Sequence, residues 1–376
     1  MTSDMIVFGE DWGAHPSSTQ HLVRRLSVDR RVVWVNSIGL RRPRLDAKDA
    51  RRVWNKARAV MGRRQAPKVS SKRTSAPFPV VEPLCIPWPG NPVAGWANGH
   101  LLGRRVGGAA GAADLQRPIL WTSLPSAVDA LGHLGERAVV YYAGDDFGAL
   151  SGVDHAAVEE QERRLADKAD LIIAASPLIA AKFDPCKTRV LPHGIDEGFL
   201  GAPGLRPLDL PQGPVAGFYG SLSDWLDQDL IRETAKRLPN WTFVLIGEER
   251  CDLSKLKAVA NIKLLGPRAH HELPAYAAHW TASLIPFRDT AQIRACNPLK
   301  LREYLSLGRP IVTTDFPALE GYRELVTVAD RAEDWTDALI KACFEPVEVL
   351  GKRRLAMASE TWDARAEELS EWLSAL

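Results

Sequence analysis

The sequence predicts an α/β protein with two doubly wound domains, in which parallel strands alternate with helices. Three observations lead to this prediction. The chain has 376 residues, which suits two domains at roughly 150 residues each. Short runs of β-branched and aromatic residues alternate with segments of helical periodicity, as is typical of parallel sheets with crossover helices. This alternation occurs twice, on either side of a segment rich in proline and glycine.

The first series of strands starts close to the N-terminus. Strands are expected at Met5–Gly9, Arg31–Asn36, Ile119–Ser123, Ala138–Ala143, Leu171–Ala175 and Arg189–Leu191. Between the first two, Ser17 or Ser18 is a natural N-cap for a helix. Such a helix places three residues on one apolar face, namely Leu22, Val23 and Leu26. The proline-rich residues 77–92 are interpreted as an insertion in this domain.

The second series of strands follows the proline- and glycine-rich segment. Strands are expected at Val215–Tyr219, Thr242–Ile246, Ile262–Leu265, Ala282–Phe287, Ile311–Thr314 and Val326–Ala329. The predicted parts are an N-terminal domain at 1–197, a linker at 198–214, a C-terminal domain at 215–360 and a final helix at 361–376. Because ligands of doubly wound sheets bind beyond the carboxyl ends of the strands, functional residues are expected directly after strands.

Composition excludes several classes of protein. With 45% hydrophobic and 25% charged residues the chain is neither disordered nor fibrous. The five cysteines form no C-x-x-C pair, so neither a zinc site nor a disulfide framework is expected. There is no apolar run long enough for a membrane span and no signal-peptide pattern at the start, so we expect a cytoplasmic protein.

Charge is distributed unevenly along the chain. Residues 1–110 hold 19 Lys and Arg against 7 Asp and Glu. Most of this excess lies in the basic segment (residues 41–73), with 13 basic against 2 acidic side chains. Such a segment suits an anionic membrane surface, and a peripheral location on the inner face of the membrane is one expectation. Nucleic acid is not expected, because no aromatic-rich binding motif accompanies the charges. A solvated surface is the alternative.

A candidate anion site begins at Asn297. Pro298 at the first helical position with Asn297 as the cap predicts a helix start, where the amide of Leu299 and its neighbours are free to bind an anion. Lys300 adds a positive charge in the first turn, and Glu303 is placed to accept hydrogen bonds from two hydroxyls, as of a ribose. The alternative is a capped surface helix without a ligand.

The run Asn297–Thr314 resembles the donor-binding helix of nucleotide-sugar glycosyltransferases with the GT-B fold, in particular the large retaining family that includes bacterial polysaccharide and lipopolysaccharide transferases. Four other segments are similar to that family in order and spacing. The first two are Val190–Asp196, with His193, and Gly217–Leu222, with Gly220 and Ser221. The third, Leu264–Pro267, is similar to the segment that borders the nucleotide base. The fourth, Thr361–Arg365, is similar to the start of a final helix that often crosses back to the first domain.

The resemblance implies two Rossmann-like domains facing each other across a cleft. It implies a nucleotide diphosphate sugar as donor, with UDP favoured, and a glycan or lipid-linked acceptor, without a metal or another cofactor. In the implied donor site Glu303 binds the ribose, Lys300 and the first-turn amides bind the diphosphate, and Gly220 and Ser221 close over it. His193 and Pro267 complete the implied set.

Two features depart from the family pattern. Its first glutamate is replaced by Ala295, and no basic residue follows Gly220, so Lys300 or Arg294 is left to neutralise the diphosphate. In having a lysine at this helix start, the chain also resembles a smaller set of inverting GT-B enzymes that add uronic acid. Retaining and inverting outcomes therefore both stay open. So do an epimerase of the same fold and a non-catalytic partner in polysaccharide assembly.

Two groups of residues in the N-terminal half are candidates for the acceptor side. Asp145 and Asp146 directly follow a strand, and repulsion between adjacent carboxylates raises one pKa, which suits proton transfer. Asp11, Trp12 and His15 follow the first strand, with Trp12 expected to stack on a sugar ring. In a retaining enzyme the aspartates would instead bind hydroxyls of the acceptor or the sugar, and the other alternative is a helix cap beside a surface acid.

The pair His270–His271 invites a metal site. Neighbouring histidines point in different directions on a helix, and no third ligand lies nearby in the sequence, so no metal is expected there.

Overall fold

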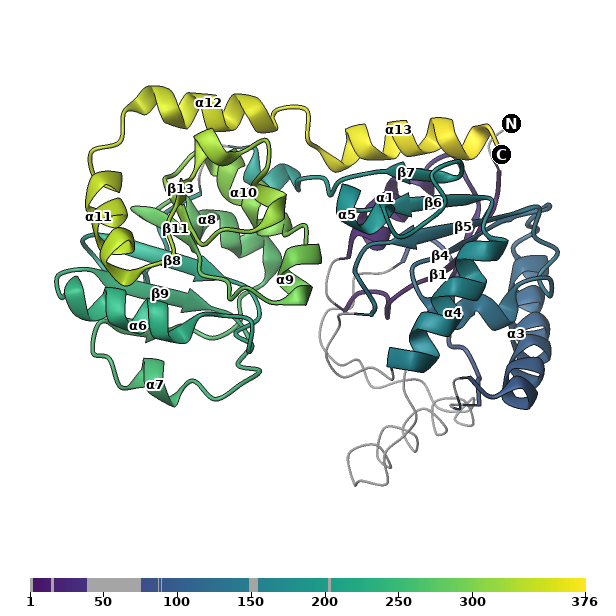
Figure 1. Cartoon of the computed structure of the whole chain (residues 1–376). Helices are drawn as coiled ribbons and strands as arrows, with labels where there is room; N and C mark the ends of the chain where they lie inside the picture. The colour runs from purple at the N-terminus through teal and green to yellow at the C-terminus, as the bar shows by residue number, and fades with distance from the viewer. Residues whose placement is uncertain are drawn as a thin grey trace. The chain divides into compact units, whose positions relative to one another are not determined.

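A computed structural model describes residues 3–14, 17–38, 76–86, 88, 90–148, 155–201 and 204–376. The chain divides into two compact units (Figure 1). Unit 1 comprises Met1–Pro192 and Arg365–Leu376, and unit 2 comprises His193–Ala364. The division falls between Pro192 and His193, so residues 198–214, expected to link two domains, belong to unit 2. The basic segment lies outside the described residues.

Unit 1 contains a seven-stranded sheet in the order β3-β2-β1-β4-β5-β6-β7, with every pair of neighbours parallel. Its strands are β1 (Met5–Phe8), β2 (Val32–Val35), β3 (Val80–Val81), β4 (Ile119–Thr122), β5 (Ala138–Ala143), β6 (Leu171–Ala174) and β7 (Thr188–Val190). Its helices are α1 (Ser18–Leu26), α3 (Pro92–Ala112), α4 (His155–Lys168) and α5 (Pro177–Ala180), with 3-10 turn η1 (Pro125–Ala130). The prediction of a parallel sheet is confirmed.

Helix α1 illustrates how the local sequence builds this unit. The hydroxyl of Ser17 accepts a hydrogen bond from the Gln20 amide at 3.3 Å, which satisfies a donor that the helix itself leaves unpaired. The predicted apolar face is buried, since Leu22, Val23 and Leu26 are each 5% exposed or less. The predicted N-cap and face of this helix are therefore confirmed.

Unit 2 contains a six-stranded parallel sheet in the order β10-β9-β8-β11-β12-β13. Its strands are β8 (Val215–Tyr219), β9 (Thr242–Ile246), β10 (Ile262–Leu264), β11 (Ala282–Ile285), β12 (Ile311–Thr313) and β13 (Thr327–Val328). Its helices are α6 (Gln228–Arg237), α7 (Ser254–Lys257), α8 (Leu273–Ala277), α9 (Ala291–Ala295), α10 (Leu299–Leu307), α11 (Ala332–Ala342) and α12 (Val347–Met357). Four 3-10 turns complete it, η2 (Glu197–Phe199), η3 (His270–Glu272), η4 (Pro317–Leu319) and η5 (Arg323–Leu325).

The last helix, α13 (Trp362–Ser374), starts in unit 2, and its residues from Arg365 onward belong to unit 1. Within unit 1 the guanidinium of Arg30 donates to the Ser370 hydroxyl at 2.9 Å, and Arg189 lies 5.2 Å from the Trp372 ring. These contacts fasten the end of the chain to the first unit. Among the described residues, no helix combines the length and the hydropathy that a membrane span requires.

Candidate functional site

The two sheets share a topological feature that positions ligands in doubly wound folds. In unit 2, β8 and β11 are neighbours, and the chain leaves them in opposite directions across the sheet, toward β9 and toward β12. Ligands bind beyond the carboxyl ends of the strands at such a switch point. The segments that follow β8 and β11 begin at Gly220 and Pro286, so the site in unit 2 is sought beside them.

The helix that carries the predicted donor residues begins one residue later than expected. Pro298 is the N-cap with extended backbone (φ −71°, ψ 120°), and α10 starts at Leu299. The prediction that Asn297 caps this helix is wrong, because its amide oxygen instead accepts a hydrogen bond from Arg302 Nη1 at 2.6 Å. No side chain caps the helix. Gly308 ends it in the left-handed conformation (φ 79°), as the sequence predicts.

Lys300 lies at this switch point among aromatic rings. Its ammonium nitrogen is 5.4 Å from the ring centre of Phe218 on β8, 5.3 Å from Trp225 and 5.3 Å from Phe287, which follows β11. It makes no hydrogen bond or ion pair with any residue that the structure describes. Burial lowers the pKa of Lys300, and the charge of Glu303 offsets this only in part. Lys300 is thus a partly desolvated cation with attraction to ring faces but without a counter-ion.

Glycines allow the loops after the strands to approach Lys300 closely. Gly220 has a φ of 139°, and a Cβ atom there would lie 3.1 Å from Lys300 Cε. A Cβ atom on Gly247, which follows β9, would lie 1.8 Å from the Gly220 carbonyl oxygen. The Gly247 amide donates to the carbonyl of Gly266 at 3.1 Å. The ends of β8, β9 and β10 therefore converge, with Ser221 exposed after the first.

Pro267, the predicted neighbour of the base, follows Gly266 and is exposed. It therefore lies at the end of β10, next to the carbonyl that receives the Gly247 amide.

Glu303 lies on α10 one turn after Lys300 and is only 3% exposed. The Tyr219 hydroxyl donates to Oε2 at 2.5 Å, and His270 Nε2 lies 3.0 Å from Oε1. Burial lowers the pKa of His270, but the hydrogen bond and charge of Glu303, with a smaller effect of Asp196, raise it above its ordinary value overall. The carboxylate is therefore held in place from both sides.

Tyr219 and His270 were not among the predicted site residues. The adjacent His271 was considered with His270 for a metal, and no group of side chains able to hold a metal ion occurs among the described residues. The position of Tyr219 at the end of β8 was an available signal, since site residues follow strands. No local pattern links His270 to Glu303.

Arg294 and Ala295 lie on α9, just before α10. Arg294 forms two hydrogen bonds of 2.6 Å with the carboxylate of Asp289, so its charge is already paired. Of the two basic residues considered for the diphosphate, Lys300 is the one without a carboxylate partner among the described residues. Ala295, at the position of the missing glutamate, is 7% exposed and packs into the unit.

His193 lies beside Trp362, with the two rings 6.3 Å apart. Burial and the charge of Arg302 lower the pKa of His193 to about 3, so the imidazole is neutral at physiological pH. The neighbouring Gly194 is pressed against the backbone of Trp362, where a Cβ atom would lie 2.5 Å from its nitrogen. His193 is thus a neutral group in a tightly packed segment.

The adjacent aspartates of unit 1 differ in their surroundings. Asp146 accepts a hydrogen bond from Lys182 Nζ at 2.7 Å and one from the Gly148 amide at 3.1 Å. Asp145 makes no hydrogen bond or ion pair within the described part of the chain. Although its side chain reaches solvent, partial desolvation and repulsion from Glu10 and Asp146 raise the pKa of Asp145. Asp145 is therefore a candidate proton acceptor, whereas Asp146 is engaged with Lys182.

The segment after β1 carries the other predicted acceptor residues. Asp11 Oδ1 accepts hydrogen bonds from the Ser37 amide at 3.1 Å and its hydroxyl at 2.7 Å. The expectation that Trp12 stacks on a sugar is wrong for this structure, because its ring is 7% exposed and packs edge-on against Trp34 and Phe78. His15 lies outside the described residues.

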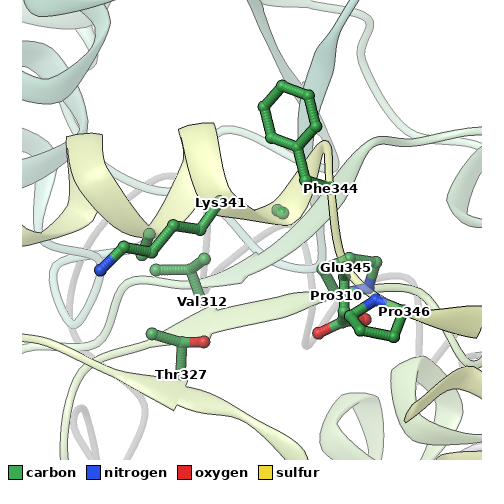
Figure 2. Close-up of a pocket in the computed structure, with 9 residues that line it drawn as sticks. Pro310, Val312, Thr327, Lys341, Phe344, Glu345 and Pro346 are labelled. Atoms are coloured by element: carbon green, nitrogen blue, oxygen red, sulfur yellow. The ribbon is translucent and has the colours of Figure 1, made fainter. Parts of the chain in front are cut away.

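A surface pocket of about 360 Å³ lies elsewhere in unit 2 (Figure 2). Pro310 and Thr327 place it at the amino ends of β12 and β13, whereas Lys300 and Glu303 lie toward the carboxyl ends. Figure 2 shows Phe344 projecting away from Val312 and Thr327. The pocket contains none of the predicted site residues.

Comparison with known proteins gives a family match and one curated relative. Residues 213–343 match a family model described as glycosyl transferases group 1. A putative teichuronic acid biosynthesis glycosyltransferase, TuaH, from Bacillus subtilis is 26% identical over 228 residues. That alignment covers 55% of this chain and 57% of the relative, so it spans little more than half of either protein.

Solved structures match over the full length. A glycosyltransferase from Rickettsia africae has a TM-score of 0.68 at 10% identity and covers 100% of this chain and 98% of its own. A sucrose-phosphate synthase from Thermosynechococcus elongatus has a TM-score of 0.68 at 13% identity, covering 99% and 98%. A trehalose-6-phosphate protein from E. coli bound with UDP-2-fluoro glucose has a TM-score of 0.64 at 11% identity, covering 100% and 99%. At such identities these matches establish the fold.

Proposed function

Because the chain carries a group 1 glycosyltransferase domain within a GT-B fold, we propose that it moves a sugar from a nucleotide diphosphate sugar, with UDP as the favoured nucleotide, to a glycan or lipid-linked acceptor in bacterial surface polysaccharide synthesis. The observation that carries the proposal is Lys300, a cation at the switch point of unit 2 that has no carboxylate at ion-pair distance among the described residues. The name of the Bacillus subtilis relative supports the polysaccharide class.

The diphosphate would bind at Lys300. Departure of the nucleotide develops negative charge on the bridging oxygen, and a cation already in place stabilises that charge as it forms. The uncapped start of α10 adds the amides of Leu299 and Lys300 and the positive end of the helix dipole. Gly220 and Ser221 would close over the phosphates, because a glycine at 220 leaves room beside the Lys300 side chain.

The nucleoside would bind at Glu303. Each carboxylate oxygen has two lone pairs, so Glu303 can accept ribose hydroxyls in addition to its bonds with Tyr219 and His270. Those two partners fix the carboxylate before the ligand arrives, which lowers the entropy cost of binding. Pro267 at the end of β10 would border the base, and His193 would contribute as a neutral hydrogen-bonding group.

The acceptor would be activated by Asp145. Its raised pKa and lack of an ion-pair partner among the described residues suit a general base that removes the proton from an acceptor hydroxyl. Asp146, paired with Lys182, would hold the segment in place, and Asp11 would bind acceptor hydroxyls from the neighbouring loop. A base of this kind corresponds to an inverting transfer, in which the hydroxyl attacks the sugar directly.

A non-catalytic partner in polysaccharide assembly is the second candidate. Ala295 favours it, since the glutamate that the resembled family carries at this position is absent. The two candidates differ in turnover: a transferase consumes the donor when its acceptor is present, whereas a non-catalytic protein binds without turnover.

The test is nucleotide binding by calorimetry with matched lysine variants. UDP should bind the wild-type chain, and Lys300→Met should weaken binding by about tenfold or more, because a charged hydrogen bond is removed. Lys352→Met, at an exposed lysine of α12, is the control and should bind as wild type. Glu303→Gln should weaken UDP binding but should not weaken the binding of inorganic pyrophosphate, because the substitution removes a negative charge near Lys300. If no nucleoside diphosphate binds the wild-type chain, the proposal is wrong.

A further inference from the structure

Helix α10 lacks the features that normally stabilise the start of a helix. No side chain caps it, and its first turn contains no acidic residue. Its first four residues instead include two cations, Lys300 and Arg302, although positive charge at this end opposes the helix dipole. Departures from local rules that collect at one point are typical of a functional site. This helix start is therefore better suited to a bound anion than to an isolated helix.

Two backbone donors at this helix start are unused. Pro298 has no N–H group, and the Leu301 amide donates to the Pro298 carbonyl at 3.1 Å. The amides of Leu299 and Lys300 donate to no other group in the described part of the chain. A helix start normally pairs such amides with a capping side chain, with water or with a ligand.

Asn297 is the residue that the sequence offers as a cap for these amides. An asparagine followed by a proline is a typical helix start, with the asparagine as N-cap and the proline at the first position. In that arrangement Leu299 and Lys300 take the second and third helical positions, and an N-cap side chain accepts a hydrogen bond from one of those two amides. Asn297 and an anion would therefore compete for the same donors.

Arg302 holds the Asn297 side chain in another contact. Side chains on a helix point back toward its N-terminus, so Arg302 reaches the helix start. Its Nη1 donates to Asn297 Oδ1 at 2.6 Å, and Oδ1 is the atom that a cap would use. Arg302 is only 5% exposed, its guanidinium carbon lies 5.6 Å from the Tyr322 ring centre, and its Nε lies 3.9 Å from Glu360 Oε2. These neighbours fix the arginine, and the arginine fixes Asn297.

We propose that Arg302 is a positioning residue, which keeps the amides of Leu299 and Lys300 open for a diphosphate by engaging the side chain of Asn297. This inference rests on the proposed function and adds a further residue of this chain to it. Donors that are already free need no rearrangement when the anion arrives, so less of the binding free energy is lost. The sequence pattern at 297–298 predicts the capped form, and Arg302 explains why the structure has the open one.

Calorimetry with UDP and inorganic pyrophosphate tests the role of Arg302. Arg302→Met should weaken the binding of both ligands by about tenfold, because Asn297 is then released and caps one of the two amides. The factor should be the same for both ligands, since an effect acting through the neighbouring Glu303 would weaken UDP alone. Arg309→Met is the control: it removes a half-buried arginine beyond the far end of α10, and both ligands should bind it as they bind wild type.

A double-mutant cycle separates the engagement of Asn297 from the charge of Arg302. In the Asn297→Ala background no side chain is left to cap the helix, so adding Arg302→Met should change the affinity for pyrophosphate by at most about threefold. An arginine that acts only through its charge, or only by supporting the fold, would cost the same factor in both backgrounds. A tenfold loss that persists in the Asn297→Ala background would overturn the proposal.

Amide hydrogen exchange reports on the helix start without a ligand. In wild type the amides of Leu299 and Lys300 should exchange rapidly and become protected when pyrophosphate binds. In Arg302→Met one of them should already be protected without a ligand, because Asn297 caps it. Since the wild-type measurement needs no variant, amides that are protected in the ligand-free wild type would overturn the proposal even if Arg302→Met failed to fold.

The two measurements also separate this inference from the proposed function. If the wild-type chain binds UDP and pyrophosphate and Arg302→Met binds them equally well, the role of Arg302 is wrong and the proposed function stands. A wild-type chain that binds neither ligand would refute the proposed function, whereas protection gained in ligand-free Arg302→Met would still support the control of Asn297 by Arg302.

Discussion

His270 Nε2 lies 3.0 Å from Oε1 of Glu303, although the two residues are 33 positions apart in the chain. The histidine sits in turn η3, after β10, and the glutamate sits on α10. Asp196 lies behind the histidine, with its Oδ2 3.9 Å from Nδ1. The Tyr219 hydroxyl and the His270 ring together fix the direction in which the Glu303 carboxylate of the candidate ribose site points.

The first prediction concerns pH. The pKa of His270 is raised in the folded chain, mainly by Glu303 acting against the effect of burial. A group with a raised pKa stabilises the fold fully below its unfolded pKa, and this contribution is lost as the pH rises through the folded value. The extra free energy of unfolding of wild type over His270→Asn should therefore be largest below about pH 6.5 and smaller at about pH 8. Urea denaturation across this range measures it.

One control makes the pH experiment specific. The same comparison in a Glu303→Gln background should show a much smaller trend, because the carboxylate that raises the pKa of His270 is then neutral. A His270→Asn difference that stays constant from acid to alkaline pH would mean that the interaction with Glu303 does not depend on the charge of the imidazole. It would then be an ordinary neutral hydrogen bond.

The central strands of both sheets could be predicted from the sequence because their burial is continuous. Every residue of β1 and β2 is buried, so each strand appears as an unbroken apolar run. β3 was missed because it consists of only Val80 and Val81, within a proline-rich segment that gives no strand signal. It is recognisable only through its pairing with β2, where Trp34 is the partner of Val80.

The candidate site was only partly predictable, because most of its contacts join residues that are distant in the sequence. Lys300 and Glu303 are neighbours on one helix, so their spacing alone places them together. The three rings around Lys300 and the two partners of Glu303 come from distant parts of the chain, and long-range contacts leave no local pattern. Trp12 was misjudged because a tryptophan after a strand gives no sign of whether its ring packs inward, as it does here against Trp34.

The second prediction separates the two aspartates of unit 1. Asp145→Asn should lower the turnover number by a factor of about 10² to 10⁴, the usual contribution of a general base, while leaving stability unchanged or slightly higher because a repulsion is removed. Asp146→Asn should instead lower the free energy of unfolding, since it breaks the 2.7 Å contact with Lys182. Donor consumption with acceptor present and thermal unfolding are the two measurements. Equal losses of turnover in both variants would contradict the assignment.

The third prediction concerns the glycines beside Lys300. Gly220→Ala should destabilise unit 2 by about 1 to 3 kcal/mol, because an alanine resists a φ of 139° and its Cβ would meet Lys300. Gly247→Ala should cost more, since its Cβ would lie 1.8 Å from a carbonyl oxygen. Gly107→Ala on α3 is the control: nothing lies within 4 Å of its Cβ, and a helical alanine should stabilise by roughly 0.5 to 1 kcal/mol.

The same variants also test the candidate phosphate site. Gly220→Ala should weaken UDP binding beyond what its loss of stability explains, because the added methyl group occupies space that Lys300 and the phosphates share. Gly107→Ala should leave UDP binding unchanged, because its position lies in unit 1. If Gly220→Ala binds UDP as wild type under conditions where it is fully folded, the loop after β8 does not contact the diphosphate, and Lys300 must hold the ligand without it.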